Sequence, residues 1–225
     1  MLYTLKPSPW SSHSRLLGSL PQRGEGRRVL DVGCGDGYLG AALATRGYLV
    51  TGIEREGGFS DAFPRDVDLL VADLEQGLPP LPHRYDHILC ADILEHLSRP
   101  DVLLRQVHAC LNPGGTLIAS LPNSGNIWFR ANIAAGRFPQ DDKGLFDRTH
   151  LRFYTWKGWQ RLFTDAGFRI TSVDPTAMPV TLVAPPRWEQ SLPVRTAESV
   201  FYGLARIRKT LFAYQFVVRA EQDSR

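Results

Sequence analysis

The chain has 225 residues, a length that fits one large α/β domain or one domain with an elaborated end. Its 43% hydrophobic and 22% charged residues are ordinary for a soluble globular protein. A net charge of +3 and a pI near 8.9 permit contact with anionic substrates or surfaces, but they are too weakly basic to indicate a nucleic-acid-binding protein.

The cysteines and the amino-terminal residues indicate in which cellular compartment the protein is expected. Cys34, Cys90 and Cys110 form no CxxC pair, so they indicate neither a disulfide framework nor a zinc site. The opening MLYTLKPSPWSSHSRLL lacks the basic region and apolar run of a signal peptide. No apolar run approaches the roughly 18 residues of a membrane-spanning helix. We therefore expect a cytoplasmic protein.

Short apolar runs alternate with helical patterns along the first half of the chain. After a short helix near residues 14–20, strands are predicted at 29–32, 48–53, 68–71, 87–90 and 116–120, with helices at 38–46 and 100–111. Asn112-Pro113-Gly114-Gly115 is a helix stop and turn before the fifth of these strands. Strands that are almost entirely apolar and alternate with helices predict an α/β fold with a parallel sheet covered on both faces.

The alternation stops after Leu121. Residues 122–150 are polar and aromatic, and a helix at 156–167 and a strand at 168–173 follow. A Pro-rich stretch at 174–194 precedes a helix that carries Val200, Phe201, Leu204, Ile207 and Leu211 on one face. The segment 211–218, LFAYQFVV, predicts a last strand. We expect one domain over 1–225, made of a core at 28–122, an insert at 123–150 and a final part at 151–225.

A glycine-rich loop follows the first predicted strand, in the stretch VLDVGCGDGYLG at 29–40. It is not a dinucleotide-binding fingerprint, because Tyr38 stands where the last glycine of that pattern would fall. It is not a phosphate-binding P-loop either, because no Gly-Lys-Ser/Thr triplet follows. Asp31, two residues before the first glycine, would repel a pyrophosphate and attract an ammonium or a sulfonium group.

Two further acidic residues close the second and third predicted strands. Glu54, at the end of YLVTGIE, can accept both hydroxyls of a ribose. Asp73 can accept from the exocyclic amine of an adenine, with Leu74 packing on the ring. Taken singly, Asp31 is better explained by a turn or helix cap, and Glu54 by a solvated loop charge. Taken together, the three predict a ligand with a cationic amino-acid end, a ribose and an adenine, but no phosphate.

These segments resemble a class I S-adenosylmethionine-dependent methyltransferase. VLDVGCGDG resembles the first motif of that family, GIE its ribose-binding position and VADLEQGLP its adenine-side motif, and YDHILCADILEHL and LNPGGTLIASLPN resemble its fourth and fifth strands. The matches cover residues 28–122 in order. The resemblance implies a Rossmann-like doubly wound seven-stranded sheet, mostly parallel with an antiparallel last strand. It also implies S-adenosylmethionine as cofactor, bound by Asp31, Gly33, Cys34, Gly35, Glu54, Asp73, Leu74 and Ala91.

Methyl transfer to a hydroxyl requires a base near the carboxyl ends of the fourth and fifth strands. His96, in Asp-Ile-Leu-Glu-His, and His150, in Asp-Arg-Thr-His, are the two candidates. The first segment resembles ubiquinone-biosynthesis O-methyltransferases and, more loosely, small-RNA 3′-end methyltransferases. That resemblance implies a divalent metal held by Asp92, Glu95, His96 and His150. Those families have a Glu at the position of Asp92, whose side chain is shorter and has less reach. Alternatively, Glu95 and His96 cap or support a helix, and His150 bonds a backbone carbonyl.

The insert at 123–150 is predicted to face the methyl acceptor. It mixes aromatic, amide and charged side chains that suit a sugar or a polar ring, namely Asn126, Trp128, Phe129, Arg130, Asn132, Phe138, Asp141 and Lys143. The alternative is a lid that packs on the domain. The stretch GLFDRTHLRFYTWKGWQRLFTDAGF resembles bacterial methyltransferases that accompany polysaccharide or lipid-linked glycan synthesis. We therefore expect the hydroxyl of a glycan or of a secondary metabolite as acceptor.

The carboxyl-terminal helix carries Arg195, Arg206, Arg208 and Lys209. A basic amphipathic helix can lie on an anionic membrane surface, although such a helix more often packs on its own domain. The function favoured by the sequence is O-methylation of a small polar acceptor with His150 or His96 as base. N- or C-methylation, a non-catalytic S-adenosylmethionine-binding module and an NAD-dependent oxidoreductase are the alternatives. Nucleic acid is not expected as a partner.

Overall fold

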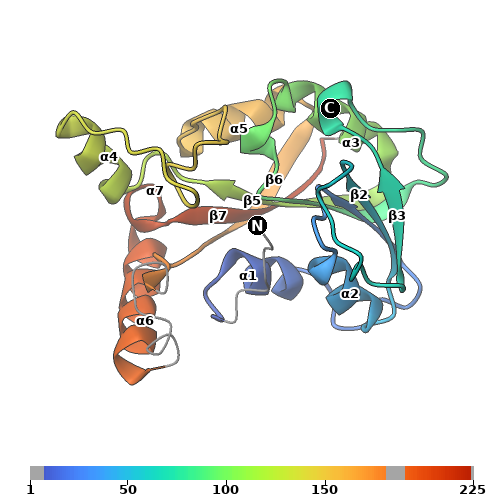
Figure 1. Cartoon of the computed structure of the whole chain (residues 1–225), viewed down its shortest axis with the longest axis horizontal. Coiled ribbons are helices and arrows are strands. Elements are labelled where there is room, and N and C mark those ends of the chain that lie inside the picture. Colours follow the sequence, from blue (N-terminus) through green and yellow to red (C-terminus); the bar gives the residue numbers. More distant parts are fainter. Residues whose placement is uncertain (1–7, 181–190, 224–225) are drawn as a thin grey trace.

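The computed structural model describes residues 8–180 and 191–223, and the seven strands within these ranges join one sheet (Figure 1). The strands are β1 (Arg28–Val32), β2 (Leu49–Glu54), β3 (Val67–Val71), β4 (Tyr85–Ala91), β5 (Leu111–Pro122), β6 (Phe168–Pro175) and β7 (Gln215–Gln222). Their order is β3-β2-β1-β4-β5-β7-β6. Neighbours among β1–β5 pair in parallel, whereas β7 runs antiparallel to both β5 and β6. The expected seven-stranded, mostly parallel sheet is confirmed.

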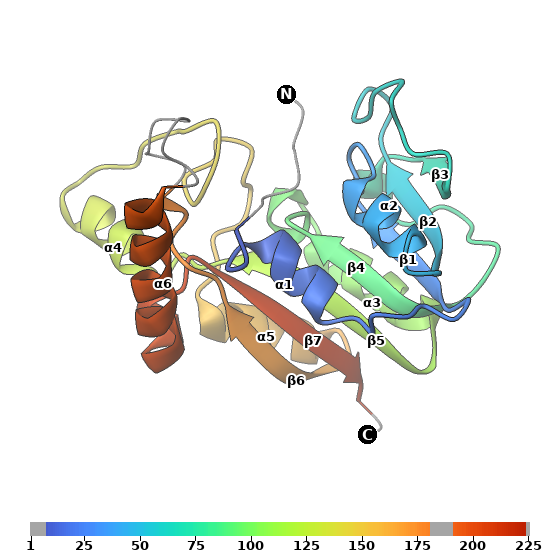
Figure 2. The same ribbon diagram turned by 90° about the horizontal axis from the view of Figure 1, so that it is seen from below.

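Helices cover both faces of the sheet (Figure 2). Helices α1 (Ser12–Gly18) and α2 (Tyr38–Ala44) pack on one face, and α3 (Pro100–Cys110) and α5 (Trp156–Asp165) pack on the other. The two faces follow from the alternation of side chains along each strand. In β1, for example, Val29 joins the core beneath α1 and α2, and Leu30 joins the core beneath α3 and α5. Burial on both faces explains why these strands are almost entirely apolar.

The predicted bounds of the last strand were wrong. Residues 209–212 form the short helix α7 (Lys209–Phe212), so β7 begins at Gln215 and continues to Gln222. The predicted strand at 116–120 is also longer, because β5 continues from Leu111 through the Asn-Pro-Gly-Gly segment with a shift in its register against β4. Each error lies at an element end, where local sequence is least decisive.

The apolar face predicted around residues 200–211 is not the buried face of α6 (Leu192–Ile207), and Leu211 lies in α7. The helix buries Val194, Glu198 and Ala205, whereas Val200 and Ile207 are 58% and 84% exposed. Glu198 can be buried because its carboxylate accepts a hydrogen bond from the Ser8 hydroxyl at 2.7 Å. A search for large apolar residues overlooks such a face, since an alanine and a hydrogen-bonded glutamate form part of it.

The insert contains a helix, α4 (Ile127–Ala134), whose amino end is capped by the Asn126 carboxamide. Helices α4 and α6 lie at the same end of the molecule in both views, and α7 lies at that end in Figure 1 (Figures 1 and 2). The side-chain amides of Asn123 and Asn126 join α4 to the segment after α7, because both donate to the Ala213 carbonyl at 2.9 Å. Within residues 8–180 and 191–223, no helix has the length and apolar character needed to cross a membrane.

Candidate active site at the carboxyl ends of the strands

Asp31 lies near the carboxyl end of β1, between Gly52 of β2 and Leu89 of β4 in the sheet register. The residue is 1% exposed, and neither carboxyl oxygen has a hydrogen-bond partner among the described residues. Burial, assisted by the charge of Glu54, raises the pKa of Asp31 to about 7. A buried carboxyl group without partners is costly to ionise, so this position suits a ligand that brings a positive charge.

The glycine loop turns immediately after Asp31. Gly33, Gly35 and Gly37 have φ of +74°, +53° and +74°, which explains why glycine recurs at alternate positions. A Cβ added to Gly33 would lie 2.8 Å from the side chain of Ile93, whereas one added to Gly35 would meet no atom within 4 Å. The backbone is therefore closely packed at Gly33 and open at Gly35, where a ligand could approach it.

Glu54 at the end of β2 contacts this loop directly. Its Oε2 accepts a hydrogen bond from the Gly35 backbone N–H at 2.9 Å, and its Oε1 accepts one from Arg55 N–H at 3.0 Å. Asp73, after β3, is exposed and caps the short helix η1 (Leu74–Gln76) by accepting from Glu75 N–H at 3.0 Å. Capping is therefore one reason for an aspartate at this position. Because the side chain is exposed, it can also contact a ligand.

The remaining expected cofactor residues lie at the same edge. Leu74 begins η1, Ala91 ends β4, and Cys34 follows the first glycine. Burial raises the pKa of the Cys34 thiol, so it is protonated at neutral pH. Sequence reasoning overlooked Gly52: a Cβ there would lie only 2.6 Å from Cys34 Sγ. The signal was available, because an isolated glycine inside an apolar strand marks a close approach.

A second cluster of polar residues follows β4. The segment η2 (Leu94–His96) holds Glu95 and His96, and the Glu95 carbonyl accepts hydrogen bonds from Leu151 and Arg152 N–H groups at 2.9 and 3.0 Å. These bonds bring the segment after the insert against η2. As a result, the His96 and His150 ring centroids lie 4.7 Å apart, and His150 Nε2 lies 3.9 Å from Glu95 Oε1.

The two histidines differ in their surroundings. His150 has a side chain that is only 7% exposed, and burial, with the neighbouring His96, lowers the pKa of its imidazole to about 4. His96 Nδ1 lies 3.0 Å from the Thr149 hydroxyl and 3.2 Å from the Thr149 carbonyl oxygen. Thr149 in turn donates its hydroxyl proton to Asp147 Oδ1 at 2.6 Å. His96 is thus oriented by the loop, and His150 is neutral and enclosed.

Asp92 does not join this cluster. Glu95, His96 and His150 each offer a ligand atom within 4.8 Å of the others, but the expected fourth ligand is absent from that group. Asp92 has φ of +51°, and its Oδ1 accepts hydrogen bonds from Ser120 and from Gln215 Nε2, the latter at 2.8 Å. Because η2 spans only Leu94–His96, Asp92 lies outside it and does not share a helix face with Glu95.

The insert supplies aromatic rings rather than free amides. Asn126 and Asn132 were expected to suit a polar acceptor, but both are buried and donate to the carbonyls of Ala213 and Trp128, each at 2.9 Å. That expectation is wrong for these two side chains, because they hold the backbone in place. Instead, four phenylalanines in and just after the insert form an aromatic cluster: Phe129, Phe138, Phe146 and Phe153. Through Phe153, this cluster contacts the ring of His150.

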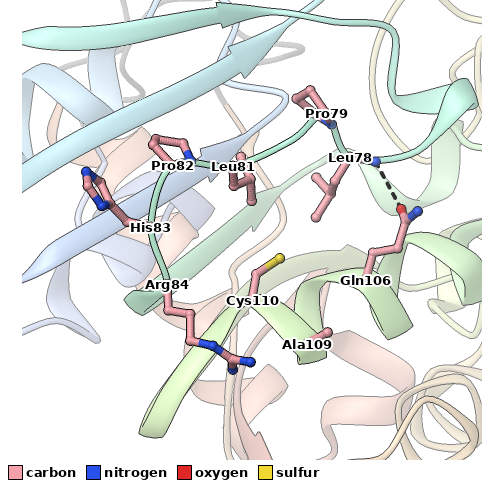
Figure 3. Close-up of a pocket in the computed structure, with 9 residues that line it drawn as sticks. All are labelled: Leu78, Pro79, Leu81, Pro82, His83, Arg84, Gln106, Ala109 and Cys110. Atoms are coloured by element: carbon pink, nitrogen blue, oxygen red, sulfur yellow. Dashed lines mark hydrogen bonds between the residues drawn. The ribbon is translucent and has the colours of Figure 1, made fainter.

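A pocket of about 520 Å³ is lined by other residues (Figure 3). It runs along the connection between β3 and β4 and faces the carboxyl-terminal half of α3. Its lining is Leu78, Pro79, Leu81, Pro82, His83, Arg84, Gln106, Ala109 and Cys110. Gln106 Oε1 accepts from Leu78 N–H at 3.0 Å across it. None of the lining residues belongs to the expected cofactor or catalytic set.

A comparison with known families decides the identity. The family described as the methyltransferase domain matches residues 10–173 of this chain, a range that includes the glycine loop, Glu54, Asp73, His96 and His150. The chain belongs to the class I S-adenosylmethionine-dependent methyltransferases. Part of the chain also matches the ubiquinone biosynthesis O-methyltransferases of Pseudomonas aeruginosa (35% identity over 105 residues) and Coxiella burnetii (32% over 113 residues). Each match covers 44% of this chain and only 45% of the relative.

Solved structures share the fold of this methyltransferase at low sequence identity. A SAM-dependent methyltransferase from Archaeoglobus fulgidus has a TM-score of 0.64 at 18% identity, covering 93% of this chain and 92% of its own. A 1,6-didemethyltoxoflavin-N1-methyltransferase from Burkholderia thailandensis, solved with that compound and S-adenosylhomocysteine, has a TM-score of 0.59 at 17% identity, covering 96% and 80%. Because one fold serves several acceptors, the acceptor must be argued from the site.

The residues of this methyltransferase fit the cofactor of the family. S-adenosylmethionine carries an ammonium and a sulfonium group, and the carboxyl oxygens of Asp31 have no partner among the residues that the structure describes. The open backbone at Gly35 leaves room beside Glu54, whose carboxylate can accept from hydroxyl groups. The dinucleotide alternative would instead place a pyrophosphate next to these two acidic side chains, which repel it.

Proposed function

We propose that this methyltransferase transfers a methyl group to a hydroxyl of a small acceptor, and that His150 removes the hydroxyl proton. The observation that carries the proposal is the neutral imidazole of His150, held beside Glu95 after β4 by the hydrogen bonds of the Glu95 carbonyl. In a doubly wound sheet, ligands bind outside the carboxyl ends of the strands, where these groups lie. The partial match to O-methyltransferases supports the same choice.

The cofactor is assigned to the residues at the ends of β1–β4. Asp31 balances the positive charge at the amino-acid end of the cofactor, and Glu54 accepts hydrogen bonds from the ribose hydroxyls. The backbone of Gly33, Cys34 and Gly35 forms the floor of the cofactor pocket. Asp73, Leu74 and Ala91 complete the site around the adenine. When bound, S-adenosylmethionine supplies an electrophilic methyl group on a sulfonium, and its sulfur keeps the electron pair of the broken carbon–sulfur bond.

His150 acts on the acceptor in this scheme. Its imidazole takes the hydroxyl proton while the hydroxyl oxygen forms the new bond to the methyl carbon. Since the pKa of His150 is about 4, the ring is neutral at physiological pH and can accept that proton. The carboxylate of Glu95, 3.9 Å away, then stabilises the imidazolium. His96, oriented by Thr149, lies against the same ring and positions it.

The same three side chains offer a second role. Two imidazoles and one carboxylate with ligand atoms within 4.8 Å form a mixed nitrogen and oxygen donor set that suits a divalent ion. We propose this ion as the alternative to the base role of His150, because an imidazole nitrogen that binds the ion cannot also accept the hydroxyl proton. Its ligands would be Glu95, His96 and His150, without Asp92. It would supply a Lewis acid that lowers the pKa of the acceptor hydroxyl.

A binding experiment tests the cofactor assignment. Calorimetric titration with S-adenosylmethionine should show micromolar binding that Asp31→Ala and Glu54→Ala both weaken. Asp66→Ala is the matched control, because Asp66 is an exposed acidic residue just before β3 and belongs to neither cluster. Absence of binding to the folded protein would refute the assignment.

A transfer experiment tests the base. Methyl transfer from labelled S-adenosylmethionine to a panel of glycans and phenols should fall about 10²- to 10⁴-fold in kcat for His150→Gln, with unchanged cofactor affinity. His83→Gln, an exposed histidine on the connection before β4, is the control. Repeating the assay with EDTA and with added Mg²⁺ tests the ion. Transfer to amines alone, or full activity of His150→Gln, would contradict the proposal.

A further inference from the structure

The outer side of α6 leaves an apolar stripe in water. Leu192, Val200 and Ile207 are 77%, 58% and 84% exposed, and they are about two helical turns apart. This spacing places them along one side of the helix, opposite the buried residues Val194 and Ala205. Single exposed aliphatic residues are ordinary, but an aligned set on one helix marks a surface that binds something.

Positive charge borders the stripe. Arg195 and Arg206 are exposed and about three turns apart, which places both along one edge of it. Residues 191–214 contain four Lys and Arg residues and a single acidic residue, Glu198. Glu198 is buried against the fold and accepts a hydrogen bond from Ser8, so it does not neutralise the outer side. The exposed face of α6 is thus apolar and cationic.

A neighbouring element shares this character. Helix α4 lies at the same end of the molecule in both views, and Asn126 at its start is bonded to the Ala213 carbonyl, after α7 (Figures 1 and 2). Trp128 on α4 is 56% exposed. Residues 123–140 contain two arginines and no acidic residue. Tryptophan and arginine are typical of surfaces that meet lipid headgroups.

We propose that the outer side of α6 docks on the surface of an anionic phospholipid bilayer. The aliphatic side chains enter the headgroup boundary, and the arginines contact lipid phosphates. A second copy of the chain is disfavoured as occupant, because a symmetric contact would place Arg195 and Arg206 of one copy against those of the other. Nucleic acid is disfavoured because its phosphate backbone binds positively charged side chains but makes no favourable contact with exposed aliphatic ones. This docking is independent of the proposed methyl transfer.

Vesicle sedimentation with the full chain tests the proposal. The protein should bind vesicles that contain phosphatidylglycerol and should not bind vesicles of phosphatidylcholine alone. Arg195→Gln with Arg206→Gln should lower the partition coefficient about 25-fold, at about fivefold for each charge removed. The control, Arg23→Gln with Arg161→Gln, removes the same charge from two exposed arginines outside α6 and should bind like the wild type. Val200→Asp with Ile207→Asp tests the apolar stripe and should also reduce binding.

The outcomes distinguish docking through α6 from a general charge effect and from dimerisation. Equal losses in the α6 variant and in the control would show a general attraction to charge and would overturn the proposal. Failure of the wild type to bind anionic vesicles would overturn it as well. A dimer in analytical ultracentrifugation that Val200→Asp with Ile207→Asp dissociates would assign the face to a second copy instead. Unchanged S-adenosylmethionine affinity in every variant would confirm that folding and the cofactor site are intact.

Discussion

Replacement of Asp31 by Asn should stabilise the cofactor-free protein at alkaline pH while abolishing strong cofactor binding. The carboxyl group has an ordinary pKa of 3.8 in the unfolded chain and a pKa of about 7 in the folded protein, mainly because it is buried. Between these two values the folded state binds the proton more tightly than the unfolded state does. Stability therefore falls as pH rises toward about 7 and stays reduced above it.

The size of the effect follows from the two pKa values. A shift of about three pKa units corresponds to about 4 kcal/mol of lost stability at about pH 8, against about 1.5 kcal/mol at about pH 5. The Asp31→Asn variant would avoid this penalty at every pH, although its buried amide carries its own cost of about 1–3 kcal/mol. The advantage of Asp31→Asn should hence grow by about 3 kcal/mol between these pH values, or about 6–12 °C in Tm.

Urea denaturation of both proteins at several pH values measures the difference directly. Asp86→Asn is the contrasting control, because Asp86 accepts from Arg28 N–H and from the Asn112 amide, both at 2.8 Å. Burial alone would raise the pKa of Asp86, but these hydrogen bonds hold it below its ordinary value, so this substitution should destabilise the protein. If Asp31→Asn is no more stabilising at pH 8 than at pH 5, the reasoning about an unpartnered carboxylate is wrong.

Three further predictions concern the same edge of the sheet. Gly33→Ala should destabilise the protein by about 1–3 kcal/mol in urea, because its φ is +74° and its Cβ would press on Ile93, whereas Gly35→Ala should cost about 1 kcal/mol from backbone strain alone. Affinity for S-adenosylmethionine should fall about tenfold for each pH unit below about 7, as Asp31 takes up a proton, and a flat calorimetric profile would count against its role. Glu54→Gln should weaken cofactor binding about tenfold with a Tm change of at most a few degrees, since the new amide oxygen can still accept from Gly35.

The sheet and the cofactor side could be predicted from sequence because their signals are local. Each strand is a short apolar run, and Asp31, Glu54 and Asp73 each lie near, at or just beyond the end of one, so parallel pairing brings them to one edge. Even the need for glycine at Gly33 follows from a turn that completes within a few residues. Such signals require no knowledge of distant contacts.

The acceptor side could not be predicted in the same way, since its geometry depends on contacts between distant residues. His150 comes near Glu95 only because the Glu95 carbonyl bonds the chain more than fifty residues later. From the sequence, Asp92 was interpreted as a metal ligand, but in the structure its carboxylate accepts a hydrogen bond from Gln215 in the last strand. Asn126 was interpreted as a ligand-binding amide, but its side chain donates a hydrogen bond to the Ala213 carbonyl. In each case a polar residue was identified correctly, and its partner was out of reach of pattern reasoning.

The same contrast bears on how the two halves of the site can vary. The cofactor half is fixed by strand ends and glycine turns, so a change there, as at Gly33, disturbs the sheet itself. The acceptor half is formed by the insert and the segment around His150, joined to the sheet by a few backbone hydrogen bonds and an aromatic cluster. Substitution of an exposed insert residue outside that cluster, such as Trp128, leaves these ring contacts in place. Changes of acceptor can thus arise in the insert without loss of cofactor binding, which is why the fold alone does not reveal the acceptor.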